Sequence, residues 1–280
     1  MWKRCWGRAA GGAALALLVA GCGTLSVPEE RSLGEELRRE VHAELRFVGD
    51  RVVNDYVSRI GQELVAAAGP QPFEYHFYVV EDDDLNAFAM PAGHVYIHTG
   101  ILLRARNVSE LAGVIGHEVG HVALRHVAEN YNRQRSAGLF QSALVLAGGL
   151  LAGQGGAAAA NVVGGLGTLA VVNSFTREAE AEADAFAVEV MPRAGYDPLG
   201  IVTFFETLRR ESGARPPEFL SSHPAPENRM EAARARIATE GLPAGLRLTD
   251  GGRLEIIQRR VRLLTGRAGS APPRGRPEDA

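Results

Sequence analysis

Cysteine is almost absent from this sequence. Among 280 residues only Cys5 and Cys22 are cysteines, and both lie near the N-terminus. No disulfide can form within the rest of the chain, which must be stabilised by packing and by any metal that it binds. With 46% hydrophobic residues, a chain of this length is expected to form one or two globular domains with a sizeable core.

An excess of one charge sign is also missing. The sequence has 30 basic and 33 acidic residues, a formal net charge of −3, and no block of basic residues. This pattern argues against nucleic acid as a partner. Long apolar runs are absent too, because glycine or polar residues interrupt the Gly- and Ala-rich segment 137–172. We favour two closely packed small-residue helices or a mobile flap there over a hairpin that spans a membrane.

The N-terminus has the pattern of an export signal. Residues 1–8 carry three basic residues and no acid, and residues 9–20 are apolar or small throughout. This is typical of a signal peptide, because the apolar stretch is too short to cross a bilayer. Residues 18–22, Leu-Val-Ala-Gly-Cys, resemble a bacterial lipobox. We therefore expect 1–21 to be a lipoprotein signal peptide, Cys22 to carry lipid that anchors the protein in the periplasm, to the outer membrane, and 22–31 to be a tether.

Hydrophobic spacing predicts the elements that follow. Apolar residues recur every three or four positions over 32–68, which indicates helix with one buried stripe, and residues 69–72 break it. Residues 73–80 are rich in aromatic and β-branched side chains and predict a strand. Residues 86–103 predict a strand pair or a strand and turn, and 95–99 have high β-propensity.

The second half of the chain is expected to be largely helical. Ser109 is predicted to be the N-cap of a helix that runs through His126. Further helices are expected over 176–190, 198–211 and 225–240. We place one folded domain at 32–245 and a C-terminal extension at 246–280, disordered after about residue 266 because that end is rich in Gly, Pro and Arg.

The predicted helix from Ser109 carries an H-E-x-x-H motif formed by His117, Glu118 and His121 inside an apolar frame. Positions i and i+4 differ by only about 40° around a helix, so the two imidazoles project together. Two neutral imidazoles at this spacing can hold one zinc ion, and the adjacent glutamate can act as a base. The alternative, a helix with two surface histidines, is less favoured because the frame is apolar.

A catalytic zinc needs a third protein ligand, and three glutamates compete for this role at 178–184. Glu180 and Asp184 are four residues apart and share a helix face, whereas Glu182 lies about 200° from Glu180. If Glu180 is the ligand, Asp184 can bond the second ring nitrogen of the first histidine. Taken alone, this segment also fits a charged surface helix.

In combination these motifs resemble the HtpX/CAAX-prenyl-protease family of gluzincin metallopeptidases, and in particular its periplasmic lipoprotein branch. The resemblance includes Gly116 to His121 with Arg125-His126 downstream, and Glu180-Ala-Glu-Ala-Asp184. It covers roughly residues 30–240, with further similar stretches at 86–93, 101–103 and 222–229.

The resemblance implies an α+β fold: a mostly helical zincin-like metallopeptidase domain with a small β-sheet beside the HExxH helix. It implies one Zn²⁺ per chain, held by His117, His121 and Glu180, with Glu118 as the general base. Substrate is expected to add as an extra strand along an edge strand formed by Gly93, His94, Val95, Tyr96 and Ile97.

Three other residues are expected to lie at or near the zinc site. His223 or Arg229 is expected to stabilise the oxyanion, and the resemblance also implies that His223 can close the fourth zinc position, two roles that exclude each other at any instant. For His126 the sequence leaves two alternatives open: it supports a zinc ligand from behind, or it lies on the surface.

The expected function is that of a zinc-dependent endopeptidase, acting on unfolded or extended polypeptides such as misfolded or unassembled envelope proteins. One rival is a non-proteolytic zinc-bound assembly factor for outer-membrane proteins, which would keep the ligands without needing Glu118 and would contact the outer-membrane assembly machinery. Another rival is an integral membrane protease that uses 137–172 as a hairpin.

Overall fold

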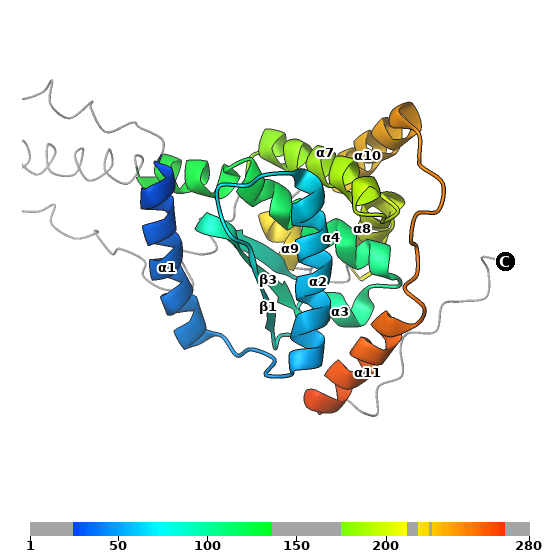
Figure 1. Ribbon diagram of the computed structural model, residues 1–280, viewed down its shortest axis with the longest axis horizontal. Coiled ribbons are helices and arrows are strands. Elements are labelled where there is room, and N and C mark those ends of the chain that lie inside the picture. The colour runs from blue at the N-terminus through cyan, green and yellow to red at the C-terminus, as the bar shows by residue number, and fades with distance from the viewer. Residues whose placement is uncertain (1–24, 136–174, 212–217, 224–225, 267–280) are drawn as a thin grey trace, which may run out of the picture.

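The computed structural model describes residues 25–135, 175–211, 218–223 and 226–266 (Figure 1). Four sequence predictions fall outside these residues: the signal peptide at 1–21, the lipid on Cys22, the helices or flap at 137–172, and disorder after 266. The described part is mostly helical and contains a small mixed sheet, as predicted. None of its helices is long and apolar enough to cross a membrane.

The sheet has three strands: β1 (His76–Val80), β2 (Ala87–Met90) and β3 (His94–His98). Their order is β1-β3-β2, with β3 parallel to β1 and antiparallel to β2. The short helix η1 (Pro91–Gly93) joins β2 to β3. Since β3 is paired on both sides, the prediction that residues 93–97 form the substrate-binding edge strand is wrong. On the side of the sheet away from β1, the edge strand is β2.

Helices cover both faces of this sheet (Figure 1). Helix α1 (Val27–Glu44) packs its Leu37 and Val41 against Phe88 and Tyr96 on one face. The larger core lies on the other face, beneath α2 (Arg51–Ala68) and α4 (Val108–Ala123). Outside α4 lie α7 (Arg177–Arg193), α8 (Leu199–Glu211), α9 (Glu218–Ser222) and α10 (Pro226–Glu240).

The helical stripe predicted over 32–68 is divided into α1 and α2. The chain becomes extended at Leu45, and Phe47 forms a bridge with Val80 of β1. A new N-cap at Asp50, whose side chain accepts from the Val53 N–H at 3.1 Å, then starts α2. Helix α1 begins at Val27, inside the segment that we expected to be a tether, because Ser26 and Glu29 form a capping box.

Helix α4 begins two residues earlier than predicted. Asn107, rather than Ser109, is the N-cap, and its side chain accepts from the Glu110 N–H at 2.9 Å. The Ser109 hydroxyl instead donates to the Arg247 carbonyl. Every residue from Val108 to Val122 is buried, which makes α4 the central helix of the domain.

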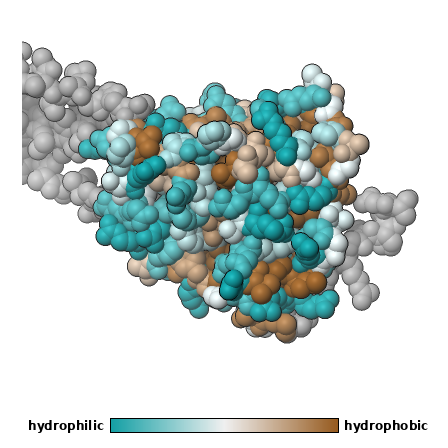
Figure 2. Space-filling view, viewed as in Figure 1, coloured by the Kyte–Doolittle hydropathy of each residue, from teal (hydrophilic) through white to brown (hydrophobic). Residues whose placement is uncertain are grey.

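The region after residue 245 contains a further helix, α11 (Arg253–Leu264), which packs against α2 and α3 (Thr99–Arg104). Its Leu254, Ile257 and Val261 are at most 3% exposed and belong to the main core. This helix is therefore part of the folded domain and not of an extension. Figure 2 shows hydrophobic surface gathered where α11 lies, and the exposed side chains there include Ile256, Leu263 and Leu264.

Glycine allows α8 to pack closely against α4. A Cβ on Gly113 would lie 2.8 Å from the backbone of Ile201, closer than real Cβ contacts. A Cβ on Gly116, one turn later, would have Ala187 Cβ at 3.5 Å as its nearest neighbour, an ordinary contact. Gly113 therefore permits a close approach of α8 that alanine would block, whereas alanine at position 116 would make only an ordinary contact.

We predict that Gly113→Ala lowers the free energy of unfolding by about 1–3 kcal/mol, because α4 and α8 must move apart. Gly116→Ala is the matched control and should leave stability unchanged or raise it, since alanine favours helix by roughly 0.5–1 kcal/mol over glycine. Urea unfolding of both variants measures this difference. Equal losses for both would show that close helix packing is not what Gly113 provides.

Candidate metal centre

Helix α4 places three functional side chains in the interior. His117, Glu118 and His121 are each at most 1% exposed. The Nε2 atoms of the two histidines lie 3.0 Å apart, as expected for positions i and i+4 on one helix face. Two lone pairs this close repel each other unless a cation or a proton lies between them.

Helix α7 supplies the third group. Glu180 is 1% exposed, and its carboxylate oxygens lie 3.5 Å from His117 Nε2 and 3.4 Å from His121 Nε2. Of the three glutamates at 178–184, Glu180 is therefore the one that faces the imidazole pair. A tetrahedral zinc with bonds of about 2.0–2.1 Å needs ligand atoms about 3.4 Å apart, which is close to the spacing seen.

His223, which directly follows α9, occupies the fourth corner. Its Nδ1 lies 3.2 Å from His117 Nε2 and 2.8 Å from Glu180 Oε1, and its side chain is fully buried. Atoms of His117, His121, Glu180 and His223 all lie within 4.8 Å of one another. Three imidazoles and one carboxylate form a donor set that zinc binds readily.

The surroundings of Glu118 also fit a metal centre. Both of its carboxylate oxygens are buried and have no hydrogen-bond partner among the described residues, and Oε1 lies 3.6 Å from His223 Nε2. A buried carboxylate without hydrogen bonds is costly unless a further group completes the site. The residues present therefore fit zinc, with His117, His121 and Glu180 as the ligands and His223 in the remaining position.

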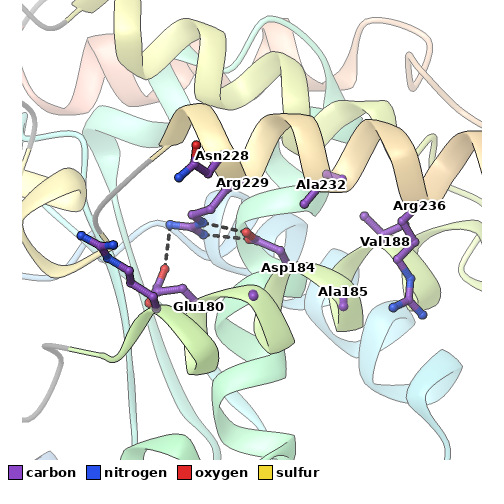
Figure 3. A pocket seen from close by; sticks show the side chains of 11 residues that line it. Glu180, Asp184, Ala185, Val188, Asn228, Arg229, Ala232 and Arg236 are labelled. Atoms are coloured by element: carbon purple, nitrogen blue, oxygen red, sulfur yellow. Dashed lines mark hydrogen bonds and ion pairs between the residues drawn. The ribbon is translucent and has the colours of Figure 1, made fainter.

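Asp184 and Arg229 support these ligands from the side of α7 and α10 (Figure 3). Asp184 Oδ1 lies 2.9 Å from His117 Nδ1, the position considered for it from the sequence. The Arg229 guanidinium donates Nε to Asp184 at 2.6 Å and lies with NH1 2.6 Å from Glu180. Because its donors face these carboxylates, Arg229 holds Glu180 in place, which differs from the oxyanion role that we expected.

His126 lies behind His121. Its Nδ1 is 3.1 Å from His121 Nδ1, and its Nε2 is 3.0 Å from Glu182 Oε2. If His121 presents the Nε2 lone pair to a metal, its Nδ1–H donates to His126, and the Nε2–H of His126 donates to Glu182. Such outer hydrogen bonds fix the tautomer and orientation of a ligand.

The buried charges alter the ionisation of the ligands in the absence of metal. Burial and the Arg229 charge lower the pKa of His117, but its hydrogen bonds to Asp184 and Glu180 outweigh them and raise it to about 9. Burial lowers the pKa of His121 well below its usual value. The metal-free pair therefore holds one proton, which a metal must displace on binding. Burial raises the pKa of Glu118.

Residues that the sequence did not indicate complete the site. Phe175 stacks on His121 with ring centroids 3.8 Å apart, and Phe219 stacks on His223 at 4.3 Å. Helix geometry turns Glu182 away from Glu180, and this angle does not reveal that Glu182 contacts His126 on another element. No local pattern around the two phenylalanines marks them as neighbours of a metal centre.

Comparison with known proteins agrees with this geometry. The sequence model of "Peptidase family M48" matches residues 52–237. The "Beta-barrel assembly-enhancing protease" of Escherichia coli (strain K12) is 35% identical over 221 residues, which is 76% of this chain and 45% of that protein. The chain thus spans less than half the length of this relative.

Two other relatives cover different shares of the chain. "Metalloprotease LoiP" of Escherichia coli (strain K12) is 33% identical over 172 residues, or 61% of this chain and 66% of that protein. "Mitochondrial metalloendopeptidase OMA1" of Arabidopsis thaliana is 34% identical over 165 residues, or 59% of this chain and 32% of that protein.

We predict that Asp184→Asn weakens zinc binding by about 10–100-fold, because a neutral amide orients His117 less strongly than a carboxylate does and removes one of the two charged partners of Arg229. Glu178→Gln is the matched control, since Glu178 is exposed on the same helix and should have no effect. Competition with a chromogenic chelator measures both affinities. An Asp184→Asn protein with wild-type affinity would show that Asp184 does not orient the ligand.

Proposed function

The chain belongs to peptidase family M48 and is a metallopeptidase, and on this premise we propose that it is a zinc-dependent endopeptidase of the bacterial cell envelope. Its substrates would be unfolded or extended chains, such as misfolded or unassembled envelope proteins. The observation that carries the proposal is the unpartnered, buried Glu118 carboxylate beside three converging ligands.

Zinc and Glu118 have separate roles in the proposed peptide hydrolysis. The chemistry that zinc supplies when bound is Lewis-acid polarisation of the scissile carbonyl and of water. Glu118 takes the proton from the attacking water and passes it to the leaving amine. Burial raises the pKa of Glu118, which makes its carboxylate a stronger proton acceptor than an exposed glutamate.

The described arrangement supports a latent resting state. His223 Nδ1 lies in the fourth ligand position, where water or substrate must enter. Its ring stacks on Phe219, and its carbonyl accepts from Arg229 NH1 at 3.2 Å, so the closed position is held from two sides. Cleavage requires His223 to leave. Only then could it serve as the oxyanion donor.

The outer edge of β2 is the place that we propose for an extended substrate; because Ala87 and Ala89 are fully buried there, this edge must be uncovered before a strand can add. Because the His98 N–H donates to Asn86 across the antiparallel pair, the backbone groups of Ala87 and Ala89 point away from β3. Among the described residues these outward groups have no backbone partner. Just before them, the Leu85 carbonyl accepts from the Phe219 N–H at 3.1 Å. Helix α9, which His223 directly follows, therefore borders the edge that a substrate strand would use.

The location in the envelope rests on the N-terminal sequence. The signal-like segment 1–21 and the lipobox at Cys22 support export to the periplasm and a lipid anchor in the outer membrane. The name of the relative, "Beta-barrel assembly-enhancing protease", supports substrates or partners in outer-membrane assembly.

A second candidate is a zinc-bound assembly factor that does not cleave. The closed fourth position favours it, because a four-ligand site has no room for substrate. It would need the ligands but not Glu118. Cells lacking the protein distinguish the two, since a Glu118→Gln variant that restores their outer membrane would support this candidate.

We predict that Glu118→Gln retains one zinc per chain and lowers cleavage of an unfolded substrate such as casein by at least about 100-fold, because no group accepts the water proton. Metal analysis and a proteolysis assay on wild type and variant measure this. Undiminished cleavage would reject Glu118 as the base.

We predict that His223→Ala raises proteolytic activity. If the closed form of the wild-type protein is about ten times more populated than the open form, the expected increase is about tenfold. Ser222→Ala in the same segment is the control and should not change activity. Initial cleavage rates at equal zinc content compare the three proteins. Lower activity of His223→Ala with zinc retained would favour the oxyanion role over the latch.

A further inference from the structure

Two residues other than glycine adopt left-handed backbone conformations in the described part of the chain: Ala92, with φ 65°, and Arg125, with φ 62°. Side chains with a Cβ disfavour this region, so such residues persist only where their surroundings hold them. Ala92 comes just before β3, and Arg125 comes just after α4. Both positions lie where a central element of the domain begins or ends.

The same carboxylate holds both positions. Glu30 of α1 is 1% exposed, and its Oε2 accepts from Arg125 Nε at 2.9 Å and from Arg125 NH2 at 2.7 Å. The Ala92 backbone N–H also acts on this carboxylate, where it opposes the rise in the pKa of Glu30 that burial causes. One turn later, a Cβ on Gly34 would lie 2.5 Å from the Pro91 carbonyl, so α1 is seated directly on the loop that contains Ala92.

The conformation of Arg125 decides where the next residue points. The left-handed turn ends α4 and starts a new helical segment at His126. That imidazole is 5% exposed and lies between His121 and Glu182, at 3.1 Å and 3.0 Å. Any other backbone conformation at Arg125 would rotate His126 away from the ligand that it contacts.

We propose that Glu30 is a positioning residue for the metal centre, which it reaches by fixing Arg125 in the left-handed turn that directs His126 at His121. Helix α1 contributes no ligand, yet through Glu30 it determines the orientation of one. This role rests on the proposed function, because it concerns the ion that His121 would bind.

The charge of Glu30 is needed for this role. A buried carboxylate must be paired, and Arg125 is its ion-pair partner among the described residues. The Arg125 guanidinium also donates to the Leu25 carbonyl, just before α1. The contact therefore forms only when α1 is docked, and loss of its charge removes the main constraint on the turn.

The test compares two buried glutamates by zinc affinity. Glu110, at the other end of α4, is also fully buried and pairs with Arg106 at 2.7 Å, but it lies away from the ligands. We expect Glu30→Gln to weaken zinc binding about tenfold, the lower end of the range for outer hydrogen-bond partners, and to alter the visible spectrum of the cobalt-substituted protein. Glu110→Gln should lower the melting temperature while leaving both readouts unchanged.

A double variant separates positioning from folding. Glycine adopts positive φ without strain, so Glu30→Gln combined with Arg125→Gly should recover part of the zinc affinity that Glu30→Gln loses. If Glu30→Gln binds zinc as wild type does, or if the double variant binds no better than Glu30→Gln, the positioning role is overturned. If Glu30→Gln does not fold, Glu30→Asp is compared in the same way with Glu30→Asp combined with Arg125→Gly.

These outcomes are distinct from failure of the proposed function. A wild-type chain that binds no zinc refutes the proposed function, and this role with it. A wild-type chain that binds one zinc, while Glu30→Gln also binds it unchanged, refutes the positioning role alone.

Discussion

The site depends on one unfavourable arrangement that must be held together. Three imidazoles and a carboxylate point their lone pairs at one place, with donor atoms as close as 2.8 Å and 3.0 Å. In a buried site such groups repel one another, or bind protons, unless a metal cation lies between them. The surrounding structure therefore has to oppose their separation, and much of it is built for that purpose.

Rigid helices and buried ion pairs keep the four ligand groups together. A Cβ on Gly120 would lie 3.2 Å from the backbone of Ala183, so the glycine within the H-E-x-x-H motif lets α7 approach α4 closely enough for Glu180 to face the histidines. Arg229 then joins α10 to Glu180 and Asp184 on α7 (Figure 3). A buried arginine of this kind is stable only because both carboxylates face it.

The same arrangement explains why activity would have to be controlled by movement. The ligands from α4 and α7 are fixed by packing, whereas His223 follows a helix of only five residues. A ligand on such a short element is the part of the centre that can leave while the other three stay. In the proposed mechanism, the adjacent contact between Phe219 and Leu85 would link this departure to the outer edge of β2.

Elements whose causes are local could be predicted from the amino-acid sequence. The i, i+4 spacing of His117 and His121 and the shared face of Glu180 and Asp184 follow from helical geometry, and the strands near residue 78 and residue 95 follow from β-propensity. Features that depend on contacts between separate elements became visible in the folded chain alone. Folding placed β3 between two strands, turned Arg229 toward carboxylates, gave His126 its partner in Glu182, and brought Glu30 to Arg125 across 95 residues. Spacing along the chain specifies which side chains share a face of one element, but it contains no information on which faces of separate elements come into contact.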